Sequence, residues 1–208
     1  MRPMSDATRD SATPGAEWSA GEPPIAWQIR DVGGRLHATL LRFADKSFAW
    51  RGPAGQSGLD GVGVENLPVY LAETLSRIPN DTMVLVVEGC KAAEALRRSA
   101  IAVVASITGA AGTPNRQVLK VLAGRPVCLW PDNDDIGRDH MRRIGELLLD
   151  IAAEVWWIEP GDRLPVGGDA ADVPPGRLGE FLDSAVPFLV ATRGRVGSNE
   201  DERKSDRR

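Results

Sequence analysis

The sequence has little of the side-chain chemistry that builds zinc sites or disulfide frameworks. It contains two cysteines and two histidines among 208 residues. Cys90 and Cys128 lie in apolar segments, and neither has a Cys or His neighbour at metal-ligand spacing. His37 and His140 are equally isolated along the chain. We therefore expect two buried free thiols and no zinc.

Long apolar runs are also missing. No stretch approaches the ~20 apolar residues that are needed to span a bilayer. Residues 1–24 mix Pro, Ser and charged residues and have no apolar centre of the kind that a secretory signal needs. We expect a cytoplasmic protein without a membrane partner.

A surplus of positive charge is absent as well, since the formal net charge is -4. A chain that clamped duplex DNA by itself would usually be basic. Any contact with nucleic acid must then be local, assisted by a metal ion, or shared with a partner protein.

Composition divides the chain into four parts. Residues 1–24 and the charged tail at residues 192–208 lack hydrophobic periodicity, so we expect both to be disordered. Between them we expect a small β-rich N-terminal subdomain at residues 25–79 and the main domain at residues 80–191.

The N-terminal subdomain is expected to be a small antiparallel β platform. Its pattern predicts three strands, at residues 26–31, 35–43 and 46–50. Gly33 and Gly34 supply the first turn, and five glycines and a proline make residues 52–64 a loop. Residues 67–78 are predicted to form a short helix.

The main domain alternates short apolar runs with helical patterns. Continuous apolar runs are typical of strands that are buried on both faces. Strands are predicted at residues 83–87, 101–105, 126–130 and 155–158, and helices at residues 92–98, 116–122, 136–151 and 176–189. This alternation predicts an α/β fold with a parallel, Rossmann-like sheet.

Acidic residues follow three of the four predicted strands. They are Glu88 after the first, Asp132 and Asp134 after the third, and Asp169 and Asp172 after the fourth. Ligands of parallel α/β sheets bind beyond the carboxyl ends of the strands, so these acids are expected at one edge. Carboxylates gathered in this way repel one another unless a cation neutralises them, and hard oxygen ligands suit Mg²⁺.

Each acidic group also has a simpler interpretation when it is taken alone. Glu88 could cap the helix that follows, and residues 132–135 could be a solvated turn with an N-cap. Asp169 and Asp172 in a Gly/Pro-rich loop could be turn residues. The convergence of all three groups on one edge is what favours a metal site.

The motifs around these acids resemble a known family. Glu88-Gly89 stands within residues 86–91, followed by Asp132-Asn133-Asp134, Gly137 and a late loop with Asp169 and Asp172. Residues 83–158 resemble the TOPRIM domain that bacterial-type primases, type IA and type II topoisomerases and OLD-family nucleases share, and with the flanking segments the resemblance covers roughly residues 26–183. The resemblance is strongest to the TOPRIM primases and primase-helicases of phages and mobile elements, in which a small β segment precedes the domain.

The resemblance implies roles for particular residues. Glu88 would act as the general acid or base, or as a carboxylate that shapes the metal site. Mg²⁺, or Mn²⁺ in its place, would be held by Asp132 and Asp134 with help from Asp169 or Asp172. Phosphate or nucleic acid would be contacted by Lys91, Arg116 and Arg138.

Departures from the family pattern narrow the options. Cys90 and Ala92 stand where relatives often carry acids. Neither a zinc ribbon nor a phosphate-binding Gly-x-x-x-x-Gly-Lys-Ser/Thr loop is found in the printed sequence. The single tyrosine, Tyr70, is predicted to pack in the platform, which argues against a topoisomerase nucleophile. A receiver-like phosphoacceptor would need a lysine after the last strand, and residues 159–163 contain none.

Three functions remain open at this point. The first is Mg²⁺-dependent nucleotidyl transfer, as in primase-like primer synthesis during DNA replication. It would use nucleoside triphosphates and a single-stranded DNA template, with a separate helicase or replication protein as partner. The second is a nuclease that cleaves phosphodiesters, and the third is a non-catalytic module that binds DNA or a replication partner.

Overall fold

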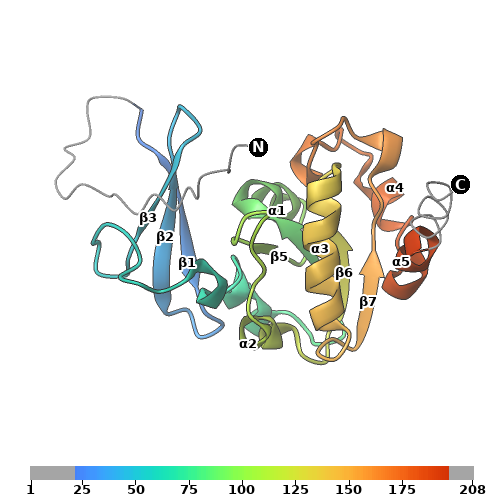
Figure 1. Cartoon of the computed structure of the whole chain (residues 1–208), viewed down its shortest axis with the longest axis horizontal. Helices are drawn as coiled ribbons and strands as arrows, with labels where there is room; N and C mark the ends of the chain where they lie inside the picture. The colour runs from blue at the N-terminus through green and yellow to red at the C-terminus, as the bar shows by residue number, and fades with distance from the viewer. Residues whose placement is uncertain (1–21, 197–208) are drawn as a thin grey trace, which may run out of the picture.

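The computed structural model describes residues 22–196 and shows two β-sheets side by side (Figure 1). The first sheet is an antiparallel meander, as the glycine turn and the alternating pattern predict. Its strands are β1 (Ile25–Arg30), β2 (Leu36–Arg42) and β3 (Phe48–Arg51). This confirms the small antiparallel platform.

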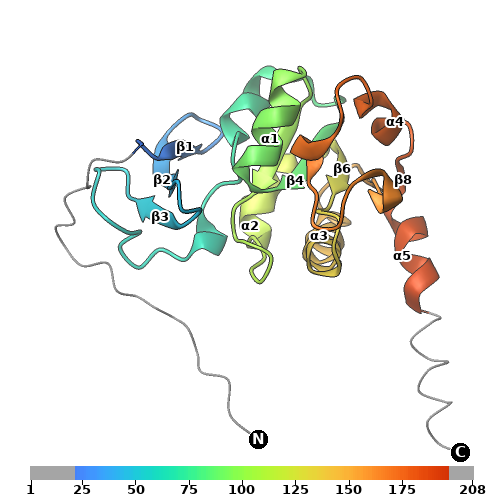
Figure 2. The ribbon, with the colours of Figure 1, turned by 90° about the horizontal axis from the view of Figure 1, so that it is seen from above.

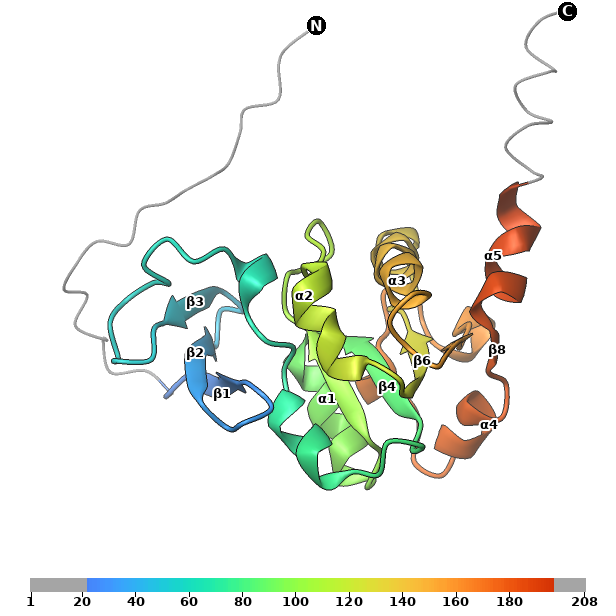
Figure 3. The same cartoon turned by 90° about the horizontal axis from the view of Figure 1, so that it is seen from below.

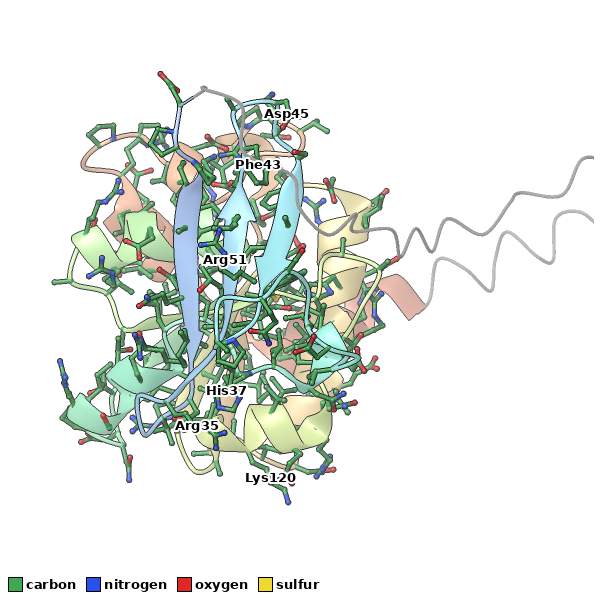
Figure 4. The ribbon with its side chains drawn as sticks, turned by 90° about the vertical axis from the view of Figure 1, so that its left-hand side faces the viewer. Arg35, His37, Phe43, Asp45, Arg51 and Lys120 are labelled. Carbon is green, nitrogen blue, oxygen red and sulfur yellow. The ribbon has the colours of Figure 1, made fainter. Side chains whose placement is uncertain are left out.

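The platform packs one face against the main domain and leaves the other outward. Trp27, Ile29 and Ala38 are buried in the core that it shares with the main domain. Figure 4 views the outer side, where Arg51 lies over the strands and His37 and Arg35 lie towards one end. His37 Nε2 is 2.9 Å from Asp31 Oδ2, so this histidine shares a hydrogen bond with a carboxylate at the end of β1.

The second sheet has the order β5-β4-β6-β7-β8, and its first four strands run parallel. These strands are β4 (Val84–Glu88), β5 (Val103–Ser106), β6 (Pro126–Trp130) and β7 (Glu154–Trp157). The fifth, β8 (Val186–Pro187), pairs antiparallel with β7 at the edge. The predicted Rossmann-like sheet is confirmed, with one antiparallel edge strand that the sequence pattern did not indicate.

Helices cover both faces of this sheet (Figures 2 and 3). Those on one face are α1 (Gly89–Arg98) and α4 (Leu178–Leu182), and those on the other are α2 (Arg116–Leu119), α3 (Asp135–Leu148) and α5 (Phe188–Val196). Successive residues of β4 alternate between the two cores, because strand side chains alternate between faces: Leu85 packs on the α1 side and Val86 on the α3 side.

Short 3-10 helices complete the described chain. They are η1 (Val64–Asn66), η2 (Ala72–Arg77), η3 (Lys120–Leu122), η4 (Gly161–Arg163) and η5 (Ala170–Asp172). None of the helices in residues 22–196 has the length and apolar character that a membrane crossing needs. Cys90 and Cys128 are buried free thiols, as expected.

The prediction of a helix over residues 67–78 is wrong for its first half. Tyr70 forms an antiparallel bridge with Ala105 at the free edge of β5, and its N–H donates to the Ala105 carbonyl at 2.9 Å. Leu71 adopts a left-handed conformation with φ of 67°, and only η2 follows it. Pairing with a distant strand outweighed local helix propensity here. Tyr70 is buried, which confirms its packing role.

The prediction of one helix over residues 176–189 is also wrong. The segment breaks into α4, β8 and α5. Pro187 has no N–H for a helical hydrogen bond and disfavours helical geometry at Val186, which instead pairs with Trp157. Helix α5 continues to Val196, past the start of the tail predicted at residue 192. The rest of that tail and residues 1–21 of the predicted N-terminal disordered segment lie outside the described residues.

Candidate functional site

The predicted acids lie where the parallel strands end. Glu88 is the last residue of β4 and pairs in register with Ser106, the last residue of β5. Asp132 and Asp134 follow β6, and Asp134 is the N-cap of α3. The parallel strands β4 and β6 pair as far as Val87 and Trp130, and the Asp132 backbone N–H lies close enough to Glu88 to lower the pKa of its carboxyl group. The structure therefore brings the ends of β4 and β6 together as the sequence predicts.

Glu88 is a largely buried carboxyl group. Burial raises its pKa to about 7, and the nearby negative charge of Asp134 adds to that effect. The Asp132 N–H and the positive charge of Arg143 act in the opposite direction. Among the described residues, Glu88 Oε1 is buried without a hydrogen-bond partner. An unpaired buried oxygen is costly, so this atom is available to a cation or to a proton.

Asp132 is a second largely buried carboxyl group at this edge. Burial raises its pKa to about 8, followed by repulsion from Glu88, Asp169 and Asp134, and Lys91 partly offsets this. Acidic residues at three strand ends are thus close enough for their charges to raise the pKa of Asp132. A divalent cation beside Glu88 and Asp132 would relieve this repulsion, and both residues offer the oxygen ligands that Mg²⁺ prefers. The chemistry of the Glu88 and Asp132 side chains is therefore suitable for binding Mg²⁺.

The other acids already have partners. The Gly137 N–H donates to Asp134 Oδ1 at 2.7 Å, which caps α3. Asp169 and Asp172 form a reciprocal capping box around η5. Within residues 22–196, no group of three or more Asp, Glu, His or Cys side chains is arranged to hold a metal ion as it stands. Metal binding would therefore require some of these carboxylates to rotate.

Lys91 joins the acidic edge from the first turn of α1. Its Nζ lies 3.0 Å from Asp169 Oδ2 and 3.5 Å from Asp172 Oδ1. Lys91 therefore neutralises Asp169 and Asp172, the two residues that the sequence predicts as accessory metal ligands. About half of the Lys91 side chain is exposed, so the amine stays accessible to a phosphate from solvent.

The other two predicted phosphate-binding residues, Arg138 and Arg116, are paired with acidic residues outside the Glu88 and Asp132 pair. Arg138 donates to Glu159 Oε1 at 2.8 Å and to the Asn133 side-chain oxygen, so its guanidinium is held inside the protein. Arg116 is 3.3 Å from Asp150, beyond the last turn of α3. A 14-residue helix is about 21 Å long, so Arg116 lies at the opposite end of α3 from the acids. The structure does not bring Arg116 to this site.

Sequence reasoning missed three polar neighbours of the acids. His140 and Ser106 are both buried, with His140 Nε2 3.1 Å from Ser106 Oγ and its Nδ1 2.9 Å from the Gly112 carbonyl. Arg143 donates to Thr113 Oγ1 at 3.0 Å and holds the same loop. Ser106 was recognisable as a strand end, but the helical residues become site neighbours only once α3 is docked.

Comparison with known proteins finds similar structures but no similar sequence family. No family model and no curated protein matches the sequence. Solved structures do match. The DnaG primase catalytic domain bound to ssDNA aligns with TM-score 0.62 and 22% identity, covering 82% of this chain and 55% of that chain. The chain has the fold of primase catalytic cores.

Two further structures have the same fold. The E. coli primase catalytic core has TM-score 0.61 and 22% identity, covering 88% of this chain and 59% of that chain. The Aquifex aeolicus primase, with zinc binding and RNA polymerase domains, has TM-score 0.62 and 22% identity, covering 92% of this chain and 47% of that chain. This chain thus spans about half the length of these solved chains.

Proposed function

We propose that this chain carries out Mg²⁺-dependent nucleotidyl transfer on nucleic acid, as in primase-like primer synthesis during DNA replication. The observation that carries the proposal is the pair of buried, mutually repelling carboxyls of Glu88 and Asp132 at the carboxyl edge of a primase-like sheet. Nucleoside triphosphates and a single-stranded DNA template are the proposed substrates. A separate helicase or replication protein is the proposed partner.

Each residue has a defined part in this proposal. When bound, Mg²⁺ (or Mn²⁺) would supply charge stabilisation for phosphate oxygens. Asp132 and Asp134 would hold it, with Asp169 or Asp172 assisting. Glu88, with a pKa raised by burial to about 7, can exchange a proton near neutral pH, as a general acid or base must. Lys91 would move from its aspartates to a substrate phosphate.

A single set of assays tests the proposal. Purified protein is incubated with labelled nucleoside triphosphates, single-stranded DNA and Mg²⁺ or Mn²⁺, and in parallel with labelled DNA alone. New oligonucleotides that disappear in Glu88→Gln and Asp132→Asn support primer synthesis. The matched control is Glu146→Gln, which removes an exposed acid elsewhere on α3 and should leave the product unchanged.

The other outcomes decide against primer synthesis. Shortened DNA that depends on Glu88 would identify a nuclease. DNA binding without any product would identify a non-catalytic module. Product that persists in Glu88→Gln would overturn the assigned site.

A further inference from the structure

Asn133, between the two aspartates of the Asp-x-Asp motif, is almost completely buried, with 7% of its surface exposed. Its side-chain amide donates to the carbonyl oxygens of Gly161 at 2.9 Å, Leu164 at 2.7 Å and Pro165 at 3.1 Å. Two N–H groups are thus shared among three carbonyls of one loop. The contacts join the end of β6 to the segment that follows β7.

The Asn133 backbone holds the same segment. Its N–H donates to the Gly168 carbonyl at 2.8 Å, and the Gly167 N–H donates to the Asn133 carbonyl at 3.0 Å. The Asn133 side-chain oxygen accepts from Arg138, whose guanidinium also pairs with Glu159 at 2.8 Å. Every polar atom of Asn133 is therefore used, and all of its partners belong to residues 159–168 or to the first turn of α3.

Asp169 follows directly on the segment that Asn133 holds. Asp169 receives the Lys91 amine at 3.0 Å, and its charge acts on Asp132. An ideal Cβ at Gly167 would lie 4.0 Å from Asp134 Oδ2, so the segment also runs past the second aspartate of the motif. The position of Asp169 beside the acids thus depends on where residues 159–168 are anchored.

We propose that Asn133 is a positioning residue, which anchors residues 159–168 so that Asp169 and Lys91 meet beside Asp132 before any metal or substrate binds. Its relevance to metal binding rests on the proposed function, whereas the anchoring itself is a property of the metal-free protein. Arg138 completes the anchor by orienting the Asn133 amide and by tying Glu159 to α3.

Asparagine is the side chain that this arrangement requires. Aspartate has the same shape but only accepts hydrogen bonds when ionised, so it would face three carbonyl oxygens without a donor. Alanine would remove both amide donors and take from the Leu164 carbonyl the hydrogen bond that Asn133 donates, a loss of free energy that the loop can recover by moving towards water. Both changes are therefore expected to release residues 159–168.

The experiment compares Asn133→Ala and Asn133→Asp with the wild type, all without metal. We expect the amides of Gly167 and Gly168 to exchange with solvent about tenfold faster or more in both variants, while the amides of β4 keep their rates. Lys91 should react faster with an amine acylating reagent once its aspartates withdraw, with Lys46 and Lys120 as internal references. Asn66→Ala, an exposed asparagine in η1, is the matched control and should change neither readout.

A metal titration connects the anchor to the site. Calorimetry with Mn²⁺ should show about tenfold weaker binding in both Asn133 variants, the usual cost of losing a residue that orients metal ligands. Exchange and acylation at wild-type rates in a folded variant would overturn the anchoring. Faster exchange with unchanged Mn²⁺ affinity would overturn the role at the metal site. A wild-type protein that binds no Mn²⁺ would overturn the proposed function, and the metal-free readouts would still decide the anchoring.

Discussion

Gly137 in the first turn of α3 lies directly against Glu88 at the end of β4. An ideal Cβ at Gly137 would stand 2.8 Å from Glu88 Oε1 and 2.9 Å from Asp132 Cβ. Such distances are shorter than side-chain atoms tolerate, so only glycine lets α3 approach the two acids this closely. Because Gly137 has no Cβ, α3 can pack directly against Glu88, the proposed catalytic residue.

Gly137→Ala is therefore expected to destabilise the protein by about 1–3 kcal/mol, because α3 or the acids must shift to admit the methyl group. Gly179→Ala is the matched control: Gly179 is also helical, and a Cβ there meets nothing within 4 Å. Urea unfolding of both variants measures the difference. Equal stability of Gly137→Ala and the wild type would contradict the close approach.

Asp132→Asn is expected to stabilise the metal-free protein at pH 8. The pKa of Asp132 is raised on folding from its ordinary 3.8 to about 8, first by burial and then by Glu88. The folded state therefore holds this proton at a higher pH than the unfolded state, and stability falls as pH rises between these values. The asparagine removes that loss, by about 1 kcal/mol or more, which is roughly 2–4 °C in Tm.

The measurement is a pair of thermal scans with chelator at pH 5 and pH 8. The wild type should lose more stability than Asp132→Asn between the two conditions. The comparison cancels the shared titrating groups that do not interact with Asp132. Parallel loss in both proteins would show that Asp132 does not titrate in this way.

Mg²⁺ is expected to stabilise the wild type more than Asp132→Asn. A ligand at ten times its dissociation constant adds about 1.4 kcal/mol to the stability of the state that binds it. The Tm at pH 8 should thus rise with Mg²⁺ concentration in the wild type and stay nearly flat in the variant. An equal rise in both would place the metal elsewhere.

Arg125→Ala is expected to cost about 2–3 kcal/mol. The buried guanidinium donates to the carbonyls of Pro79 at 2.8 Å and Leu75 at 2.9 Å, which ties η2 to the base of the main sheet. Its loss removes charge-assisted hydrogen bonds from these carbonyls, and such bonds contribute about 1.5–3 kcal/mol to stability. Arg177→Ala, which removes only an exposed pair with Glu180, should cost less than about 0.5 kcal/mol. Denaturant unfolding that ranks the two variants equally would refute this.

Arg116→Ala is expected to leave any Mg²⁺-dependent activity within about twofold of the wild type, since Arg116 pairs with Asp150 at the far end of α3. Lys91→Ala, at the acidic edge, should lower activity more strongly because a phosphate contact is lost. The measurement is the rate of product formation at saturating metal. A large loss in Arg116→Ala would bring this arginine back into the site.

Local patterns sufficed for most of the main domain. The apolar run before Glu88 predicts a strand buried on both faces, and β4 is such a strand. Parallel strands carry their carboxyl ends to one edge, so Glu88 and Asp132 could be placed together without coordinates. The helix predictions for residues 67–78 and 176–189 were wrong because part of each segment pairs with a strand that is distant in sequence.

The sequence by itself determined the α/β class, the buried strands and the edge at which the acids gather, because these follow from periodicity and from the direction of parallel strands. Only the tertiary structure decided which oxygens remain unpaired and which are already bound. Lys91 meets Asp169 across 78 positions, and Asn133 meets Pro165 across 32. Hydrogen bonds of this kind form only when separate elements dock against one another, and no local pattern in the chain encodes that docking.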